Sequence, residues 1–119
     1  MLKKIKDTLH AMTQPRYATI NARELTELKK TQPDLQILDV RTPRECQKGT
    51  LPQATMADVM SPQFKKQVQN LNFHKPILVY CQSGNRSKVA CSLLKNIGAE
   101  KLYNLAGGYG AYLNQKGNQ

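Results

Sequence analysis

Hydrophobic positions follow two different periods along the chain. Compact apolar runs over residues 17–20, 37–40, 77–80 and 101–105 predict β-strands, and residues 51–56 predict a turn followed by a further short strand. The run over residues 77–80 is apolar at every position, which is typical of a strand buried on both faces of a sheet.

Helices are predicted between these strands. Asn21 and Glu24 have the spacing of a capping box, which opens a helix ending near Lys30. Thr42 and Glu45 form a second such box, with Pro43 at the first helical position and Gly49 as the stop. Three more helices are predicted: one from Ser61 with Phe64, Val68 and Leu71 on its apolar face; one from Ser87 to Gly98 with Val89, Ala90, Leu93, Leu94 and Ile97 on one side; and one after Gly107-Gly108 with Tyr109, Tyr112 and Leu113.

Strands that alternate with helices predict an α/β fold with a mostly parallel central sheet and helices on both faces. A chain of 119 residues has room for one such domain, which we expect over residues 15–119.

Residues 1–14 form a separate amphipathic leader in this interpretation. Leu2, Ile5, Leu9 and Met12 recur at helical intervals among lysines, and Pro15 ends the pattern. The leader can pack on the domain or fray in solvent. Its basic face also permits a weak membrane-surface or partner helix.

Composition and charge restrict the class of protein. Hydrophobic residues at 39% and charged residues at 22% indicate a soluble globular protein, and no apolar run approaches the ~20 residues of a membrane span. The net charge of +10 favours anionic small molecules or acidic proteins, although the lysines can equally serve solubility alone. Aromatic residues at 6% do not interleave with the basic residues, so no specific nucleic-acid partner is expected.

The three cysteines, Cys46, Cys81 and Cys91, have irregular spacing without a CxxC pair, and only two histidines accompany them. This pattern predicts neither a disulfide scaffold nor a zinc site, and free thiols suit a reducing compartment. Because no apolar signal segment follows the basic start, a cytoplasmic location is expected.

The segment Cys81–Ser87 carries the candidate chemistry. It follows the most buried strand and precedes a helix, so its amides and the helix N-terminus can surround an anion. Such stabilisation would lower the pKa of Cys81 from about 8.5 toward neutrality. Arg86 adds positive charge and a planar fork for a substrate oxyanion. The alternative interpretation is a buried, inert Cys81.

The other two thiols are predicted to be structural. Cys91 falls on the apolar side of its helix with Ala90 and Leu94, which predicts core packing. Cys46 ends a short helix and is expected to be half-buried, and a resolving or redox role is its alternative interpretation.

Four segments in this order resemble the signatures of the single-domain rhodanese-like sulfurtransferases. They are Asp39–Glu45, Gly49–Ala54, Cys81–Ser87 and Leu105–Tyr109, and together the resemblance covers about residues 17–115. The resemblance implies that Cys81 is the nucleophile that carries sulfane sulfur as a persulfide. It also implies that the amides of residues 82–87 cradle this sulfur, the loop being formed by Gln82, Ser83, Gly84, Asn85, Arg86 and Ser87.

The same resemblance implies supporting roles for Asp39 and Arg41 in holding the neighbouring loop, and a reaction without metal or organic cofactor. The expected partner is a small anionic sulfur donor such as thiosulfate, with a protein thiol as a further donor or acceptor.

Some positions depart from the family pattern. Thr50 stands where the family has His, and Gln53 where it has Gly. Cys46 replaces an aromatic residue, and tyrosines at 109 and 112 replace Trp. Gln82 and Asn85 make the loop less cationic than loops suited to thiosulfate, so these departures affect the choice of sulfur donor rather than the fold.

Three alternative functions remain open at this stage. A cysteine-dependent phosphatase or arsenate reductase would also use a Cys…Arg loop, but only four residues separate Cys81 from Arg86, one fewer than such phosphatases use. A binding or regulatory module of the same fold would commonly lack the cysteine. A persulfide carrier would pass sulfur between proteins.

Overall fold

The computed structural model describes residues 16–117, and the predicted leader over residues 1–14 lies outside them. The elements follow in the order β1 (Ala18–Ile20), α2 (Ala22–Thr31), β2 (Gln36–Asp39), α3 (Pro43–Gln47), β3 (Thr55–Met56), α4 (Phe64–Gln67), β4 (Ile77–Tyr80), α5 (Arg86–Asn96), β5 (Leu102–Leu105) and α6 (Gly108–Gly117). None of the helices within residues 16–117 is long and apolar enough to span a bilayer.

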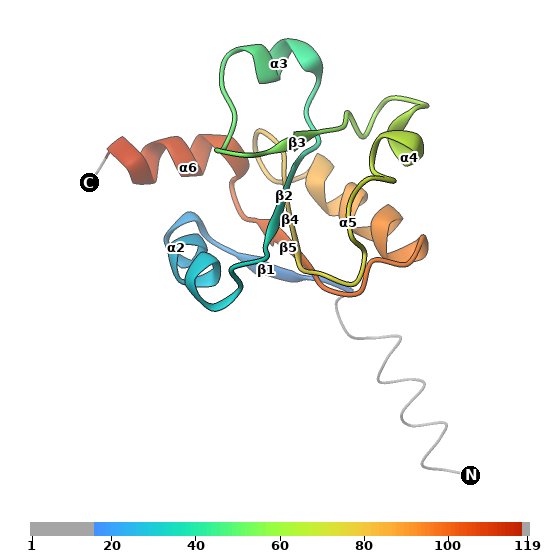
Figure 1. The fold of residues 1–119 in the computed structure, drawn as a ribbon. Coiled ribbons are helices and arrows are strands. Elements are labelled where there is room, and N and C mark those ends of the chain that lie inside the picture. The colour runs from blue at the N-terminus through green and yellow to red at the C-terminus, as the bar shows by residue number, and fades with distance from the viewer. Residues whose placement is uncertain (1–15, 118–119) are drawn as a thin grey trace, which may run out of the picture.

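The five strands form one parallel sheet in the order β1-β5-β4-β2-β3. Helices α2 and α6 cover one face of this sheet, and α4 and α5 cover the other (Figure 1). The predicted α/β class with a parallel sheet and helices on both faces is therefore confirmed. The central strand β4 is flanked by β2 and β5, and all four of its residues are buried.

Two hydrophobic cores form because side chains alternate across the sheet. Ile77 and Val79 of β4 belong to the core beneath α5, which also includes Ala90, Cys91 and Leu94. Leu78 and Tyr80 belong to the core beneath α2 and α6, with Leu25, Leu105 and the partly buried Tyr109 and Tyr112 packed around them.

Both predicted capping boxes are present. The Asn21 side chain accepts from the Glu24 amide at 2.8 Å at the start of α2, and the Glu24 carboxylate accepts from the Asn21 amide. Thr42 and Glu45 make the same reciprocal pair at α3, which begins with Pro43 as expected. Helix α3 therefore has a fixed position above the carboxyl ends of the strands (Figure 1).

Two helix predictions need correction. Helix α4 has only four residues; Val68 is its C-cap and Leu71 lies beyond it, although both pack with Phe64 into the same core. On α5 the prediction placed Val89 and Leu93 on the buried side, but their side chains are 57% and 38% exposed. At 100° per residue, Ser87, Ala90, Cys91 and Leu94 face the sheet, which turns Val89 and Leu93 outward.

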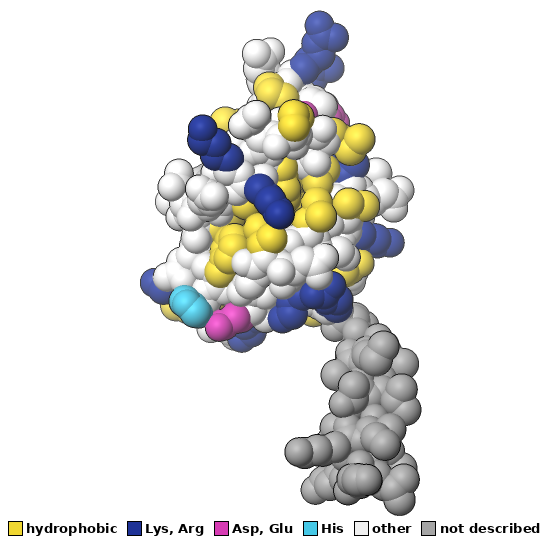
Figure 2. All heavy atoms as spheres, turned by 90° about the vertical axis from the view of Figure 1, so that its right-hand side faces the viewer, with side chains coloured by type: hydrophobic (Ala, Val, Ile, Leu, Met, Phe, Trp, Pro, Cys, Tyr) yellow, Lys and Arg dark blue, Asp and Glu magenta, His cyan; other side chains and the backbone are white. Residues whose placement is uncertain are grey.

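The face of the molecule that bears α4 and α5 displays apolar side chains interspersed with Lys and Arg (Figure 2). The exposed large apolar residues among residues 16–117 include Met56, Met60, Val89 and Leu93.

Candidate active site

The candidate active site lies where β4 ends and α5 begins. Cys81 is the first residue after β4, and its side chain is fully buried. The chain then turns through Gly84, which has a φ of +103° that a side chain would strain. A Cβ at Gly84 would also come within 3.1 Å of the Gly107 amide nitrogen. The loop therefore packs closely against the backbone that follows β5.

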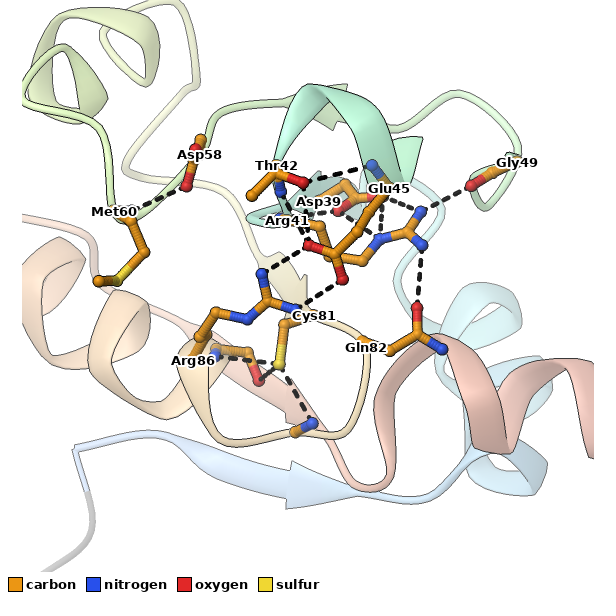
Figure 3. A network of polar contacts seen from close by, with 12 residues as sticks. Asp39, Arg41, Thr42, Glu45, Gly49, Asp58, Met60, Cys81, Gln82 and Arg86 are labelled. Carbon is orange, nitrogen blue, oxygen red and sulfur yellow. Dashed lines mark hydrogen bonds and ion pairs between the residues drawn. The ribbon is translucent and has the colours of Figure 1, made fainter. Parts of the chain in front are cut away.

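Main-chain and side-chain groups of this loop point at the Cys81 sulfur (Figure 3). The amide of Gly84 donates to Sγ at 3.1 Å and the amide of Ser87 donates at 3.4 Å. The thiol in turn donates to Ser87 Oγ at 3.5 Å. These contacts give the sulfur the surroundings of an anion-binding nest.

This environment determines the acidity of the thiol. Burial of Cys81 raises its pKa, but the hydrogen bonds that the thiolate accepts from the Ser87 hydroxyl and from the amides of Ser87, Gly84 and Ser83 outweigh burial. The pKa of Cys81 therefore lies below its ordinary value, so the thiolate is more populated than in a free cysteine.

The sequence predicted that the amides of residues 82–87 surround the sulfur, and hydrogen bonds to Sγ come from the amides of Gly84 and Ser87. The Gln82 and Asn85 side chains are exposed, and Asn85 caps α5 without a side-chain hydrogen bond. The carbonyl groups at the start of the loop point away from the sulfur: Cys81 accepts from the Tyr109 amide at 2.8 Å, and Gln82 from the Gly110 amide at 3.1 Å. The first turn of α6 therefore fixes the outer side of the loop.

Arg86 differs from its predicted arrangement. Its two terminal nitrogens donate to the two carboxylate oxygens of Glu45, at 2.7 and 2.8 Å, so the guanidinium fork holds a protein carboxylate instead of facing an open oxyanion site. The hydrogen bond from Arg86 lowers the pKa of Glu45 to about 2, against the opposing effect of burial. Glu45 therefore stays ionised and keeps the loop joined to α3.

Asp39 and Arg41 form a buried ion pair at the end of β2. Arg41 donates from Nη2 and Nε to the Asp39 carboxylate, at 2.8 Å for the shortest bond. It also donates to the Gln82 side chain at 3.1 Å and to the Gly49 carbonyl at 2.6 Å. The two residues thus connect β2 to the Cys81 loop and to the segment after α3, and neither reaches the sulfur (Figure 3).

The two other thiols are buried. Burial raises the pKa of Cys46 to about 11 and that of Cys91 to about 12. Cys91 packs in the core, as predicted, whereas Cys46 is more buried than the predicted half. Cys46 lines a cavity of about 440 Å³ beside α3, together with Pro43, Met56 and Asp58. Neither Cys81 nor Arg86 lines this cavity, so it is separate from the sulfur site.

Within residues 16–117 no three His, Cys, Asp or Glu side chains gather in an arrangement that could hold a metal ion.

Two residues of the site were not predicted as such. Glu45 was recognised only as the partner of Thr42 in a capping box, and its sequence distance of 41 residues from Arg86 gives no local signal. Asn104 of β5 accepts from Ser87 Oγ at 2.5 Å and is fully buried. A polar residue inside an otherwise apolar strand was the available signal for Asn104.

A parallel α/β sheet with a thiol in a nest of amides beyond its central strand defines a class of cysteine-based transferases and phosphatases. Within that class, residues 21–115 match the model of the rhodanese-like domain. The chain belongs to the rhodanese-like domain family.

Relatives and solved structures agree with this assignment. A sulfurtransferase from Allochromatium vinosum is 28% identical over 89 residues, which cover 75% of this chain and 81% of that protein. A human single-domain sulfurtransferase, TSTD1, superposes with a TM-score of 0.68 at 25% identity and covers 86% of this chain and 97% of its own. The chain is thus similar in extent to proteins named as sulfurtransferases.

Other relatives are longer. A tRNA uridine(34) hydroxylase from Teredinibacter turnerae is 31% identical over 87 residues, which cover 70% of this chain and 27% of that protein. The chain likewise spans 57% of the length of a Bacillus subtilis relative to which it is 34% identical. The rhodanese-like domain therefore also occurs as one part of larger proteins.

Proposed function

We propose that this protein is a sulfurtransferase that moves sulfane sulfur through a persulfide on Cys81. The observation that supports the proposal most directly is the pair of amide hydrogen bonds from Gly84 and Ser87 to the Cys81 sulfur. Such fixed donors stabilise an anionic sulfur without needing to reorganise during the reaction.

The proposed reaction has two steps, and thiosulfate serves as the small anionic donor. In the first step the Cys81 thiolate attacks the outer sulfur of thiosulfate. A new S–S bond forms on Cys81, the S–S bond of thiosulfate breaks, and sulfite leaves with the bonding electron pair. The loop amides then hold the terminal sulfur of the persulfide as an anion.

In the second step a nucleophilic acceptor attacks the terminal sulfur of the persulfide. With cyanide as acceptor, a C–S bond forms, the S–S bond to Cys81 breaks and the thiolate returns. A thiol, free or on a protein, can accept the sulfur in the same way and becomes a persulfide itself. Because the electrons balance within each step, the cycle needs no metal or organic cofactor.

The distinction from a phosphatase rests on the loop. Four residues separate Cys81 from Arg86, and the guanidinium fork that would face a phosphate is occupied by Glu45. The loop therefore offers few free donors to the oxygens of a tetrahedral phosphate. A single sulfur atom needs fewer donors.

Intact-mass measurement after incubation with thiosulfate tests the proposal. The native protein should gain the mass of one sulfur atom, and reductant or cyanide should remove it. Cys81→Ser should gain none, whereas Cys46→Ser, a matched control with the same substitution at a buried thiol, should still gain one. A native protein that takes up no sulfur but hydrolyses an aryl phosphate would establish the phosphatase alternative.

A further inference from the structure

The amide of Asn104 is only half used in the structure. Asn104 lies on β5, beside Val79 of β4 in the sheet, and its side chain is fully buried beneath the Cys81 loop. Its Oδ1 accepts from Ser87 Oγ at 2.5 Å. Its Nδ2 is buried too, yet no group among residues 16–117 accepts a hydrogen bond from it. An unpaired buried N–H is costly and calls for a physical reason.

The hydrogen-bond direction accounts for this orientation of the amide. The Cys81 thiol donates to Ser87 Oγ, and Ser87 Oγ donates to Asn104 Oδ1, so the protons along this chain point away from the sulfur. This direction suits a neutral thiol. A thiolate has no proton to donate and needs the Ser87 hydroxyl to turn toward it.

When the Ser87 hydroxyl turns to the sulfur, its oxygen becomes an acceptor that lacks a donor. Rotation of the Asn104 amide by half a turn places Nδ2 where Oδ1 was. The chain then runs from Asn104 Nδ2 to Ser87 Oγ and from Ser87 to the Cys81 sulfur, while Oδ1 takes the buried position that Nδ2 leaves. Without the reversal, two acceptor oxygens, Ser87 Oγ and Asn104 Oδ1, would face each other at 2.5 Å.

We propose that Asn104 is a positioning residue that reverses its amide when Cys81 loses its proton, and that it thereby holds the Ser87 hydroxyl on the thiolate. With the neutral thiol, Asn104 Oδ1 accepts from Ser87; with the thiolate, Asn104 Nδ2 donates to Ser87, which leaves the Ser87 hydroxyl free to donate to the sulfur. This inference rests on the proposed role of Cys81 as nucleophile.

The two charged groups closest to the loop on neighbouring elements are held in ion pairs. Arg86 on α5 is bound to Glu45 on α3, and Arg41 is bound to Asp39 at the end of β2. The remaining titratable groups near the loop are Asp58, close to Arg86; Cys91, beneath Cys81 on α5; and Lys88, behind the loop. The Ser87–Asn104 chain differs from them because its direction can reverse.

A cavity of about 120 Å³ behind the loop offers a competing explanation. Asn104 lines this cavity together with Gly84 and Lys88. If the Asn104 amide simply binds solvent there, its orientation should be independent of Cys81. The two explanations differ in what the amide does when the thiol ionises.

The first experiment follows the Asn104 side-chain amide by ¹⁵N NMR across the titration of Cys81. The Nδ2 resonances should shift with the same midpoint as alkylation of Cys81. Cys81→Ser, the matched control that cannot form a thiolate, should abolish the shift, and Ser87→Ala should remove most of it. Resonances that do not change as Cys81 ionises would overturn the proposal.

The second experiment is a double-mutant cycle on the Cys81 alkylation midpoint. Asn104→Asp keeps the side-chain shape, but its carboxylate only accepts and so retains the Ser87 hydroxyl. The loss of thiolate at neutral pH should be about threefold to tenfold larger with Ser87 present than in the Ser87→Ala background, where only the added charge acts. Equal effects in both backgrounds would contradict the reversal.

These measurements use no sulfur donor, so they can succeed or fail independently of the sulfur-transfer proposal. The NMR titration of the native protein also gives an answer if Asn104→Asp does not fold.

Discussion

Arg86 and Glu45 join the Cys81 loop to helix α3 through two parallel hydrogen bonds of 2.7 and 2.8 Å. Glu45 owes its place to the capping box at Thr42, which fixes the first turn of α3. The capping box at Thr42 therefore also determines where the Arg86 guanidinium lies. Both side chains are 30% exposed, so the pair is partly screened by solvent.

The first prediction concerns acid stability. The pKa of Glu45 is about 2 in the folded state against an ordinary 4.5, so its contribution to stability is complete above about pH 4.5 and is lost as the pH falls toward 2. Glu45→Gln should lower the free energy of unfolding by about 1 kcal/mol at pH 7 and show a smaller further loss at pH 3 than the native protein. Urea unfolding at both pH values measures this difference.

Glu27→Gln is the matched control for that experiment, because Glu27 pairs with Lys30 on the surface of α2 at 3.4 Å. It should leave the acid dependence close to that of the native protein. If the free energy of unfolding falls equally between pH 7 and pH 3 in the native protein and in Glu45→Gln, the Arg86 pair adds nothing to stability.

The second prediction concerns the buried pair of Asp39 and Arg41, whose side chains are nearly inaccessible. Asp39→Asn keeps the shape but leaves the charge of Arg41 buried without its counter-ion. The free energy of unfolding should fall by about 3 kcal/mol, measured from urea curves at pH 7. A loss below about 0.5 kcal/mol, as expected for a surface pair, would mean that Gln82 and Gly49 alone satisfy the guanidinium.

The third prediction concerns the close approach of α6 to the loop. A Cβ at Gly108 would collide with the Cys81 carbonyl oxygen and lie 2.7 Å from the Gln82 carbonyl carbon, at a φ of +58°. Gly108→Ala should therefore cost about 2 kcal/mol or more in stability and displace the loop. The midpoint temperature of thermal unfolding and the extent of persulfide loading on Cys81 should both decrease.

Gly117→Ala tests the specificity of that effect, because a Cβ at Gly117 meets nothing within 4 Å. It should keep both the thermal midpoint and persulfide loading close to those of the native protein. If Gly108→Ala behaves like Gly117→Ala, the first turn of α6 does not constrain the loop.

The fourth prediction concerns the reactivity of the three thiols. Burial raises the pKa of Cys46 to about 11 and of Cys91 to about 12, whereas hydrogen bonds lower that of Cys81. A small alkylating reagent at pH 7 should label Cys81 first, and the other two only after unfolding. Peptide mapping of the labelled protein checks the order, and labelling of Cys46 ahead of Cys81 would be the contrary result.

The sequence was sufficient for features that depend on local patterns. The capping boxes at Asn21 and Thr42 and the apolar strand over residues 77–80 are encoded by neighbours within a few residues, and the structure has each of them. The position of Cys81 after the buried strand follows from the same pattern.

Features that depend on distant neighbours were not accessible in this way. Val89 and Leu93 lie on one stripe of α5, and Ala90, Cys91 and Leu94 on an adjacent one; the packing of the helix on the sheet decides which stripe is buried. The Arg86–Glu45 pair likewise joins residues whose proximity exists only after β2 and β4 have paired.

The complete burial of Cys81 distinguishes the addition of one sulfur atom from the formation of a mixed disulfide. A mixed disulfide with a bulky thiol, such as a tripeptide or a protein chain, would require the surrounding loop to open. One additional sulfur atom extends only about 2 Å beyond Sγ. The enclosure therefore accommodates one added sulfur atom on Cys81 while it opposes exchange of Cys81 with a bulky disulfide.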